Sequence, residues 1–230
     1  MTENLEIRKK FLKYLESFIT ENKRTLFDKI ITQRTKHITV ALEDIYQSQN
    51  ASAVLRTCDC FGIQDVHIIE NKNTYSVNPD VALGATKWLN LNKYNQEENN
   101  TLACYHALRE KGYRILATTP HKDDAMLDEL SLDTKVALVF GTELEGLSDV
   151  AIENADAYVK IPMYGFTESL NISVSAAITL HHLTEKLRNS KLDWKLKEEE
   201  MIDTRIMWAK SVIKHPGVHE KAFMEQEGLD

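Results

Sequence analysis

Short apolar runs alternate with amphipathic stretches along the middle of the chain, and this alternation is the feature that most restricts the fold. Strands that alternate with helices indicate βαβ units and a parallel sheet. We therefore expect an α/β domain whose mostly parallel sheet carries helices on both faces. Strands are expected at His37–Ile45, Val66–Glu70, Arg114–Thr119, Val136–Phe140 and Ala157–Ile161, a short strand or irregular edge at Trp88–Lys93, and helices at Ala51–Phe61, Glu98–Lys111, Leu147–Asn154 and Leu170–Arg188.

Helical stretches stand before and after this domain. Asn4–Glu21 and Thr25–Gln33 have apolar residues three and four positions apart, which predicts a helical N-terminal arm. Asp193–Pro216 predicts one further helix that ends at Pro216 and Gly217, with frayed residues after it. The chain is thus divided into a helical arm (1–36), a core (37–189) and a C-terminal helical extension (190–230).

The charge is unevenly spread along the chain. The net charge of −7 argues at first against a nucleic-acid partner. Residues 1–36, however, contain nine Lys or Arg and five Asp or Glu, whereas residues 37–183 contain ten and twenty. A basic arm before an acidic core is compatible with RNA contacts made by the arm, and a merely solvated basic helix would give the same pattern.

Other bulk features indicate a cytoplasmic protein. The chain has no run of eighteen apolar residues, so no membrane span is expected. The N-terminal sequence MTENLEIRKKF lacks the apolar region of a secretory signal. The three cysteines are odd in number and have no metal-binding spacing, so we expect reduced thiols and no bound metal.

The stretch from residue 160 to residue 178 joins a strand to a helix. Pro162 is expected to end the strand, and Gly165 to take a positive φ in the turn that follows. Thr167 or Ser169 would then cap the helix. This helix is almost free of charge up to Leu180, so we expect it to be buried.

Polar residues gather at the first turn of that helix. Ser169 and Asn171 lie where helix N–H groups have no partner within the helix and a ligand can be held. A capped turn between two core elements would give the same pattern. Two further polar segments follow other strands: Asn50 and Arg56 lie in QNASAVLRT, and Gly141, Glu143 and Gly146 lie in GTELEGL.

These three segments together resemble the motifs of the SpoU/TrmH branch of the SPOUT RNA methyltransferases. The family motifs are N-x-x-A-x-x-R-T, then a strand ending in G-x-E-x-x-G-L, then I-P-M followed by S-L-N-x-S. All three are present here, in that order and without a gap. The resemblance extends over roughly residues 38–187. It implies a SPOUT fold with a deep C-terminal trefoil knot, and a homodimer with the active site at the subunit contact.

The resemblance also implies a reaction and a cofactor. The expected activity is methyl transfer from S-adenosyl-L-methionine to a ribose 2′-hydroxyl of RNA. The catalytic residues that the motifs indicate are Arg56, Asn50, Glu143, Ser169 and Asn171. The cofactor would be bound mostly by backbone groups, at Thr118, Val139, Phe140, Gly141, Thr142, Glu143, Ile161 and Leu170. Sequence leaves open whether Arg56 acts as the base or stabilises the forming alkoxide, because an isolated guanidinium is a poor base.

Each of these residues has a plainer interpretation. Asn50 is well placed as a helix N-cap, and Arg56 as a surface or ion-pairing arginine. Glu143 would serve equally as a helix cap or an ion-pair partner. For Ser169 and Asn171, capping and ligand binding are compatible.

The extensions bear on the RNA substrate. Short helices on both sides of the core, with LRTCD after the first motif, resemble the members that methylate a guanosine of the tRNA D-loop. Arg24 and Arg34 on the arm are then candidate phosphate contacts. The alternatives are a ribosomal-RNA 2′-O-methyltransferase and a non-catalytic RNA-binding relative.

Overall fold

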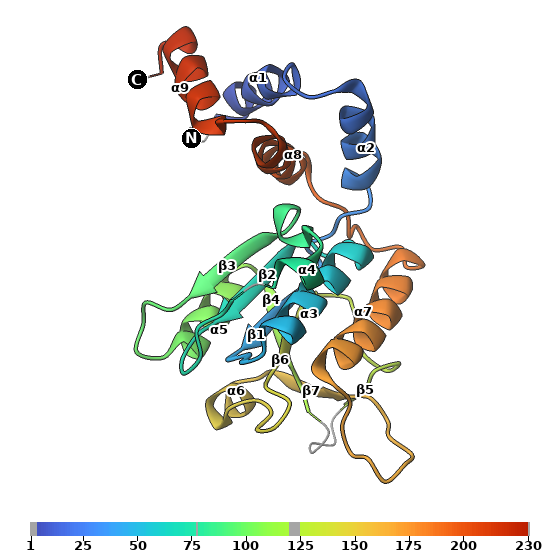
Figure 1. Ribbon diagram of the computed structural model, residues 1–230. Helices are drawn as coiled ribbons and strands as arrows, with labels where there is room; N and C mark the ends of the chain where they lie inside the picture. The colour runs from blue at the N-terminus through green and yellow to red at the C-terminus, as the bar shows by residue number, and fades with distance from the viewer. Residues whose placement is uncertain (1–3, 77, 120–124, 230) are drawn as a thin grey trace. The chain divides into compact units, whose positions relative to one another are not determined.

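The computed structural model describes residues 4–76, 78–119 and 125–229 of the 230-residue chain. The chain forms two compact units (Figure 1). One contains residues 35–194, and the other combines residues 1–34 with residues 195–230. Among the described residues, no helix has the length and apolar character that crossing a membrane requires.

The unit of residues 35–194 is built on a parallel sheet. Its strands have the order β3-β2-β1-β6-β4-β7-β5, and every pairing between neighbouring strands is parallel. The α/β prediction with a parallel sheet is therefore confirmed. The strands are β1 (Ile38–Glu43), β2 (Asp65–Ile69), β3 (Asn90–Tyr94), β4 (Tyr113–Thr118), β5 (Ala125–Met126), β6 (Lys135–Phe140) and β7 (Ala157–Lys160).

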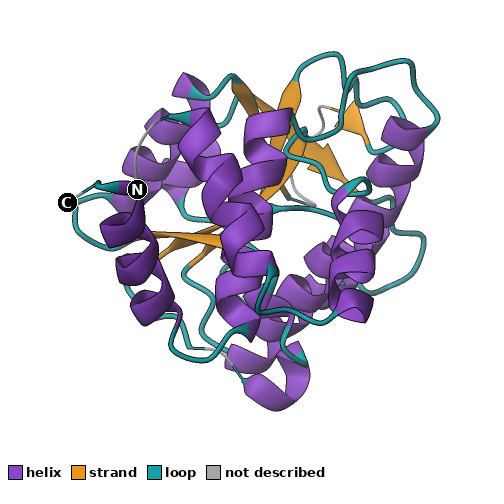
Figure 2. Cartoon of the chain, turned by 90° about the horizontal axis from the view of Figure 1, so that it is seen from above, coloured by secondary structure: helices purple, strands orange, loops and turns teal. Residues whose placement is uncertain are grey.

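Helices cover both faces of this sheet (Figures 1 and 2). Helices α3 (Ser48–Phe61) and α7 (Ile172–Arg188) pack in a core with Val40 and Leu42 of β1. Helices α5 (Asn100–Glu110) and α6 (Asp149–Glu153) pack on the opposite face, in a core with Ala41. Successive side chains of a strand point to opposite faces, so β1 contributes to both cores. Two short helices, α4 (Pro79–Ala82) and η1 (Ala85–Lys87), precede β3.

The second unit contains the helices α1 (Leu5–Glu16), α2 (Glu21–Ile31), α8 (Glu198–Val212) and α9 (Pro216–Glu227). Phe11 of α1 packs on Phe223 of α9 with ring centroids 4.9 Å apart, and Phe27 of α2 packs on Trp208 of α8 at 5.3 Å. The two ends of the chain thus share one apolar core, although they are far apart in sequence. The division into arm, core and extension stays a prediction.

The prediction of one C-terminal helix that ends at Pro216 is wrong. Pro216 is the first residue of α9, and the N-cap His215 has a φ of 53°. Proline ends a helix when it follows one, but it also fits the first helical position, where its missing N–H is not needed. Sequence alone did not separate the two roles.

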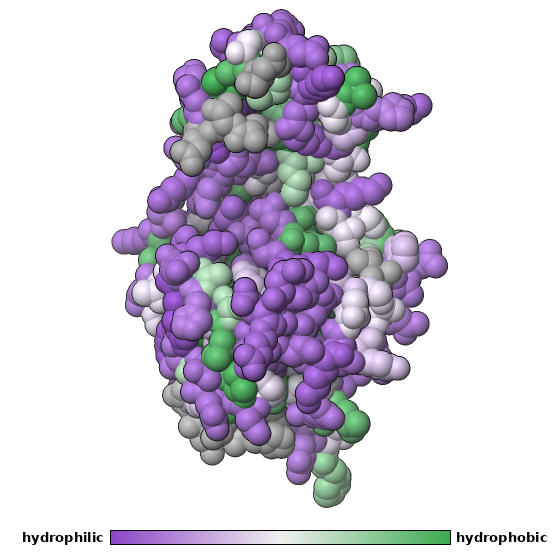
Figure 3. All heavy atoms as spheres, turned by 90° about the vertical axis from the view of Figure 1, so that its left-hand side faces the viewer, coloured by the Kyte–Doolittle hydropathy of each residue, from purple (hydrophilic) through white to green (hydrophobic). Residues whose placement is uncertain are grey.

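Large apolar side chains mostly lie inside the units. On the face drawn in Figure 3, apolar residues form small separate groups among hydrophilic ones. Helix α7 is an exception to its predicted burial, because Val174 and Ile178 are 43 % and 40 % exposed. The helix is therefore buried on one side, where Ile172, Ala176 and Leu180 lie in the core, and partly exposed at Val174 and Ile178.

A buried histidine lies in the middle of β2. His67 is 1 % exposed, and its Nδ1 lies 3.1 Å from the hydroxyl of Tyr94 on β3. Burial lowers the pKa of His67 to about 3, and the positive charge of Lys111 acts in the same direction. The folded protein therefore holds this ring neutral across the physiological range.

We predict that His67 makes the fold sensitive to acid. Well above pH 6.5 the ring is neutral in both the folded and the unfolded chain, so it adds no pH dependence to the free energy of unfolding. Below pH 6.5 the unfolded chain binds a proton that the folded chain excludes. The free energy of unfolding should fall by about 1.4 kcal/mol per pH unit as pH drops below 6.5, or about 2 kcal/mol at pH 5.

Urea unfolding of the wild type and of His67→Gln across pH 5 to 7.5 measures this effect. The free energy of unfolding of the wild type, relative to that of His67→Gln, should fall by that amount between pH 6.5 and pH 5, since glutamine does not titrate. His106→Gln, which removes an exposed histidine, is the matched control. A difference between wild type and His67→Gln that stays constant with pH would contradict the prediction.

Candidate active site

The loops that follow β1, β2 and β6 leave the sheet at the same edge, because the strands are parallel. Between them lies a cleft of about 430 Å³. Ligands in open α/β sheets gather at this carboxyl edge. The cleft is lined by Ile45, Tyr46, Gln47, Asn50, Lys72, Asn73, Thr142, Glu143, Leu144, Glu145 and Ile172.

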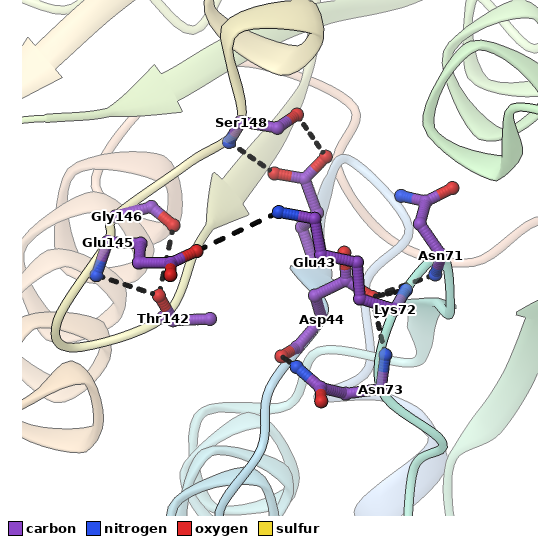
Figure 4. A network of polar contacts seen from close by, with 9 residues as sticks. All are labelled: Glu43, Asp44, Asn71, Lys72, Asn73, Thr142, Glu145, Gly146 and Ser148. Carbon is purple, nitrogen blue, oxygen red and sulfur yellow. Dashed lines mark hydrogen bonds and ion pairs between the residues drawn. The ribbon is translucent and has the colours of Figure 1, made fainter.

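Glu43 holds the loop after β6 in place (Figure 4). It is the last residue of β1 and is 2 % exposed. Its carboxylate accepts hydrogen bonds from the backbone N–H of Ser148 at 2.8 Å, the hydroxyl of Ser148 at 2.8 Å and the hydroxyl of Thr101 at 2.5 Å. A buried carboxylate needs such donors, because an unpaired charge in the interior is costly. Glu43 thereby fixes the far end of the loop 141–148.

Asp44 does the same for the loop after β2. Its Oδ1 accepts from the backbone N–H groups of Asn71, Lys72 and Asn73 at 2.7, 2.8 and 3.2 Å (Figure 4). Asp44 has a φ of 52°, in the left-handed region that aspartate tolerates better than most residues. The positive φ turns its short side chain towards these three N–H groups. Two neighbouring acids thus anchor two loops of the cleft.

The loop 141–148 is closed on itself. Thr142 and Gly146 exchange backbone hydrogen bonds of 2.9 and 3.1 Å, and Gly146 has a φ of +72°. A Cβ on Gly141 would lie 2.2 Å from the carbonyl oxygen of Gly146. Gly141 is therefore needed because two backbone segments pass each other closely, and the G-x-E-x-x-G spacing is explained by this turn.

Asn171 brings the three sequence motifs together. Its Nδ2 donates to Oδ1 of Asn50 at 3.3 Å and to Oε1 of Glu143. Asn50 belongs to α3, Glu143 to the loop after β6, and Asn171 directly precedes α7. Asn50 also donates to Gln47 at 3.0 Å. Polar groups from three distant segments therefore meet at one side of the cleft.

The predicted helix caps are different in the structure. Helix α3 begins at Ser48 with Gln47 as its N-cap, so Asn50 is a buried residue inside the first turn. Asn171, not Thr167 or Ser169, caps α7, and its Oδ1 accepts from the N–H of Ser173 at 2.9 Å. The caps expected at Asn50, Thr167 and Ser169 are therefore wrong, whereas the interpretation of Asn171 as a helix cap is confirmed. Gly165 does not have a positive φ.

The residues predicted to bind the cofactor lie at the ends of β4, β6 and β7. The hydroxyl of Thr118 donates to the carbonyl of Val139 at 2.8 Å, which ties β4 to β6. Val139 and Phe140 are buried, and Ile161 and Leu170 are half-buried. These positions offer apolar side chains and backbone groups at one edge of the sheet.

The segment after β7 is open to solvent. Within the described part of the chain, residues 162–169 take part in no hydrogen bond. Tyr164 and Phe166 are 95 % and 109 % exposed. None of the residues 162–169 lines the cleft.

Comparison with known proteins agrees with these motifs. Residues 37–181 match the model of the SpoU rRNA methylase family. The chain belongs to this family. A tRNA (guanosine(18)-2′-O)-methyltransferase of Borreliella burgdorferi is 45 % identical over 87 % of this chain and 90 % of its own length. One of Thermus thermophilus is 32 % identical over 70 % of this chain and 81 % of its own length.

Solved structures agree with the fold. The TrmH/SpoU tRNA modifying enzyme of A. aeolicus matches 84 % of this chain and 98 % of its own chain, with a TM-score of 0.72 and 29 % identity. An AdoMet-bound rRNA methyltransferase from Sinorhizobium meliloti matches 70 % of this chain and 60 % of its own, with a TM-score of 0.58. At 22 % identity this second match concerns the fold alone.

Two predicted catalytic residues of this SpoU-family chain stand apart from the polar cluster. Arg56 is exposed on α3, six residues after Asn50 and thus about 9 Å further along the helix axis. Ser169 is exposed as well. Among the described residues neither side chain has a hydrogen bond or ion pair, and neither residue lines the cleft. Their assignment stays a prediction.

The predicted RNA contacts differ in exposure. Arg24 is exposed on α2, but Arg34 is 3 % exposed and its guanidinium lies 5.4 Å from the centre of the Trp208 ring. A phosphate cannot reach a guanidinium that is buried in this way, so the structure argues against Arg34 as an RNA contact.

Glu43 and Asp44 were missed by sequence reasoning. The sequence signal for them was a pair of acids at the end of an apolar strand.

We predict that Gly141→Ala disrupts the site without unfolding the sheet. The added methyl group would displace the loop 141–148, because the atoms it meets belong to the backbone of Gly146 and Leu147. Methyl-transfer activity should fall by about 100-fold or more, since misplacement by an ångström can cost that much.

Gly217→Ala, in α9 of the second unit, is the matched control and should keep the activity of the wild type. A Cβ there meets no neighbouring atom within 4 Å, and the φ of Gly217 is not positive. Thermal unfolding of both variants checks that the fold is retained. Equal activity in Gly141→Ala and wild type would contradict the close approach.

Proposed function

We propose that this protein is an S-adenosyl-L-methionine-dependent ribose 2′-O-methyltransferase that acts on guanosine 18 of tRNA. The relatives named for this activity match it over most of both chains. The structural observation that carries the proposal is the hydrogen bonding of Asn171 to Asn50 and Glu143, which joins all three family motifs.

The cofactor would supply an electrophilic methyl group on a positively charged sulfur. The ribose O2′ would form its bond to the methyl carbon in line with the C–S bond that breaks, the neutral thioether S-adenosyl-L-homocysteine would leave, and the hydroxyl proton would pass to water. The task of this chain is mainly to align the two reactants, which can lower the barrier greatly. Asn50, Glu143 and Asn171 hold the loops that carry the reactants, and Arg56 would lie at the forming alkoxide as a donor of positive charge.

The cofactor would lie at the ends of β4, β6 and β7. Thr118, the loop from Val139 to Glu143, Ile161 and Leu170 would contact it, mainly through backbone groups. Support comes from the exposed rings and unpaired backbone of residues 162–169 described above. The trefoil knot belongs to the same proposal, because the segment before α7 is the part of the chain that would be threaded.

A homodimer would explain the position of Arg56. Helices α3 and α7 pack side by side, and Val174 and Ile178 of α7 are exposed although apolar. A second copy that covers these residues would bury them and bring an exposed Arg56 towards the reactants of the partner. The exposed apolar residues of α7 support this arrangement.

The cytoplasm, where tRNA is modified, is the proposed place of action.

The proposal is tested with purified protein, labelled S-adenosyl-L-methionine and unmodified RNA. Total tRNA should accept the methyl group, and ribosomal RNA should not. A tRNA transcript with adenosine in place of guanosine 18 should lose the label. Label in ribosomal RNA alone would favour the alternative substrate, and no label in any RNA with normal cofactor binding would indicate a non-catalytic relative.

We predict that Arg56→Ala greatly slows methyl transfer but leaves the affinity for the cofactor unchanged. The turnover number should fall by at least about 100-fold, as expected when a charge that stabilises the transition state is removed. Calorimetric titration should show S-adenosyl-L-methionine bound as in the wild type. Arg56→Lys keeps a charge without the planar guanidinium and should recover little activity. Normal turnover in Arg56→Ala would exclude Arg56 from catalysis.

A further inference from the structure

The cleft contains features that the family motifs do not include. Lys72 is the single cationic side chain among the described residues that line it, and Glu143 and Glu145 are its acids. Lys72 pairs with Glu145 at 3.8 Å, and each of the two side chains is 74 % exposed (Figure 4). Tyr46 lines the same cleft and is 78 % exposed.

We propose that this cleft holds one nucleotide of the RNA, with its base stacked on Tyr46 and its phosphate bound by Lys72. The ammonium of Lys72 exchanges the carboxylate of Glu145 for the phosphate when RNA binds. The inference rests on the proposed function, and it adds residues that hold the nucleotide.

The position of Lys72 is set by Asp44. The backbone N–H groups of residues 71–73 all donate to Asp44 Oδ1. This turn would otherwise be a backbone nest for an anion, but its donors are already occupied. These three N–H groups are therefore not available to a phosphate, and the ammonium of Lys72 is the group by which this loop can bind one.

The ion pair with Glu145 is weak enough to exchange. Exposed ion pairs contribute little to stability, because water screens them and the side chains lose freedom. Glu145 lies in the loop 141–148, whose ends are fixed by Glu43 and by the turn at Gly146. The carboxylate can therefore leave Lys72 without a change in the backbone. The negative charge of Glu145 also repels the phosphate, and this weakens phosphate binding.

Tyr46 offers a face for the base. It follows Ile45, which is 8 % exposed and anchors this part of the chain in the core. Single-stranded RNA is recognised by bases that stack on exposed aromatic rings. A cleft of about 430 Å³ lies near the lower end of the range for ligand sites, about 300–1,000 Å³, and suits one nucleotide. Asn50, four residues after Tyr46, would then lie beside the ribose.

The first test measures the salt dependence of RNA binding. Lys72→Gln should weaken tRNA binding roughly 5- to 10-fold at 0.1 M salt and lower the slope of log K against log[salt] by about 1, as expected for one lost phosphate contact. Glu145→Gln should tighten binding several-fold. Lys87→Gln removes an exposed lysine that precedes β3, at the opposite edge of the sheet, and should change neither quantity.

The second test concerns the base. Tyr46→Ala should raise KM for tRNA about tenfold or more, while Tyr46→Phe, which keeps the ring, should stay near wild type. The affinity for S-adenosyl-L-methionine, measured by calorimetric titration, should stay unchanged in these variants and in Lys72→Gln, because these residues contact the nucleotide and not the cofactor.

The two proposals fail in different ways. If the wild type methylates tRNA, but Lys72→Gln and Lys87→Gln have the same affinity and salt slope, the inference is overturned and the proposed function stands. An equal loss in both variants would mean that only the overall charge matters, and would also overturn it. If the wild type itself does not methylate tRNA, the proposed function is overturned.

Discussion

Two adjacent buried carboxylates at the end of β1 determine the shape of the site. Glu43 and Asp44 leave the strand in opposite directions, since consecutive residues of a strand alternate and Asp44 then turns with a positive φ. Each is supplied with hydrogen bonds from another loop. A carboxylate that is buried and paired in this way is costly to displace, because removing its donors leaves an uncompensated charge. The two loops are therefore fixed relative to the sheet before any ligand binds.

This arrangement separates rigid parts of the site from adaptable ones. The loop 141–148 is pinned at both ends and closed by its own backbone bonds. Residues 162–169 form no such bonds within the described chain. The first suits the positioning of polar groups around Asn171, and the second offers free backbone groups to a ligand. Function would arise where these two segments lie at the same edge of the sheet.

The terminal unit changes how the charge of the chain is interpreted. Arg8 pairs with Asp203 at 2.7 Å, Lys9 with Glu198 at 3.0 Å and Lys10 with Glu227 at 2.7 Å. The excess of basic residues in the first 36 positions is thus partly balanced by acids from the C-terminal helices. Arg34 is buried against Trp208. A basic arm in sequence is therefore not a basic surface in the structure, and the number of cations available to RNA is smaller than the composition suggests.

The sequence by itself determined the fold class and the chemistry of the site. Alternating apolar and amphipathic runs specify a parallel sheet covered by helices, because period and burial are local properties of the chain. The three motifs specified Asn50, Glu143 and Asn171, whose contact the structure then displays. The bounds of the strands that were predicted differ from the observed ones by at most two residues, whereas the short β5 was not predicted.

Only the tertiary structure decided which of several similar residues takes each role. Asn171 caps α7 although Thr167 and Ser169 were equally suited by type, and Pro216 begins a helix that it was expected to end. Glu43, Asp44 and the ion pair of Lys72 with Glu145 depend on segments that lie about 30 to 100 residues apart in sequence. Such contacts are set by the order of the strands in the sheet. That order follows from the packing of the whole chain and leaves no local pattern to read.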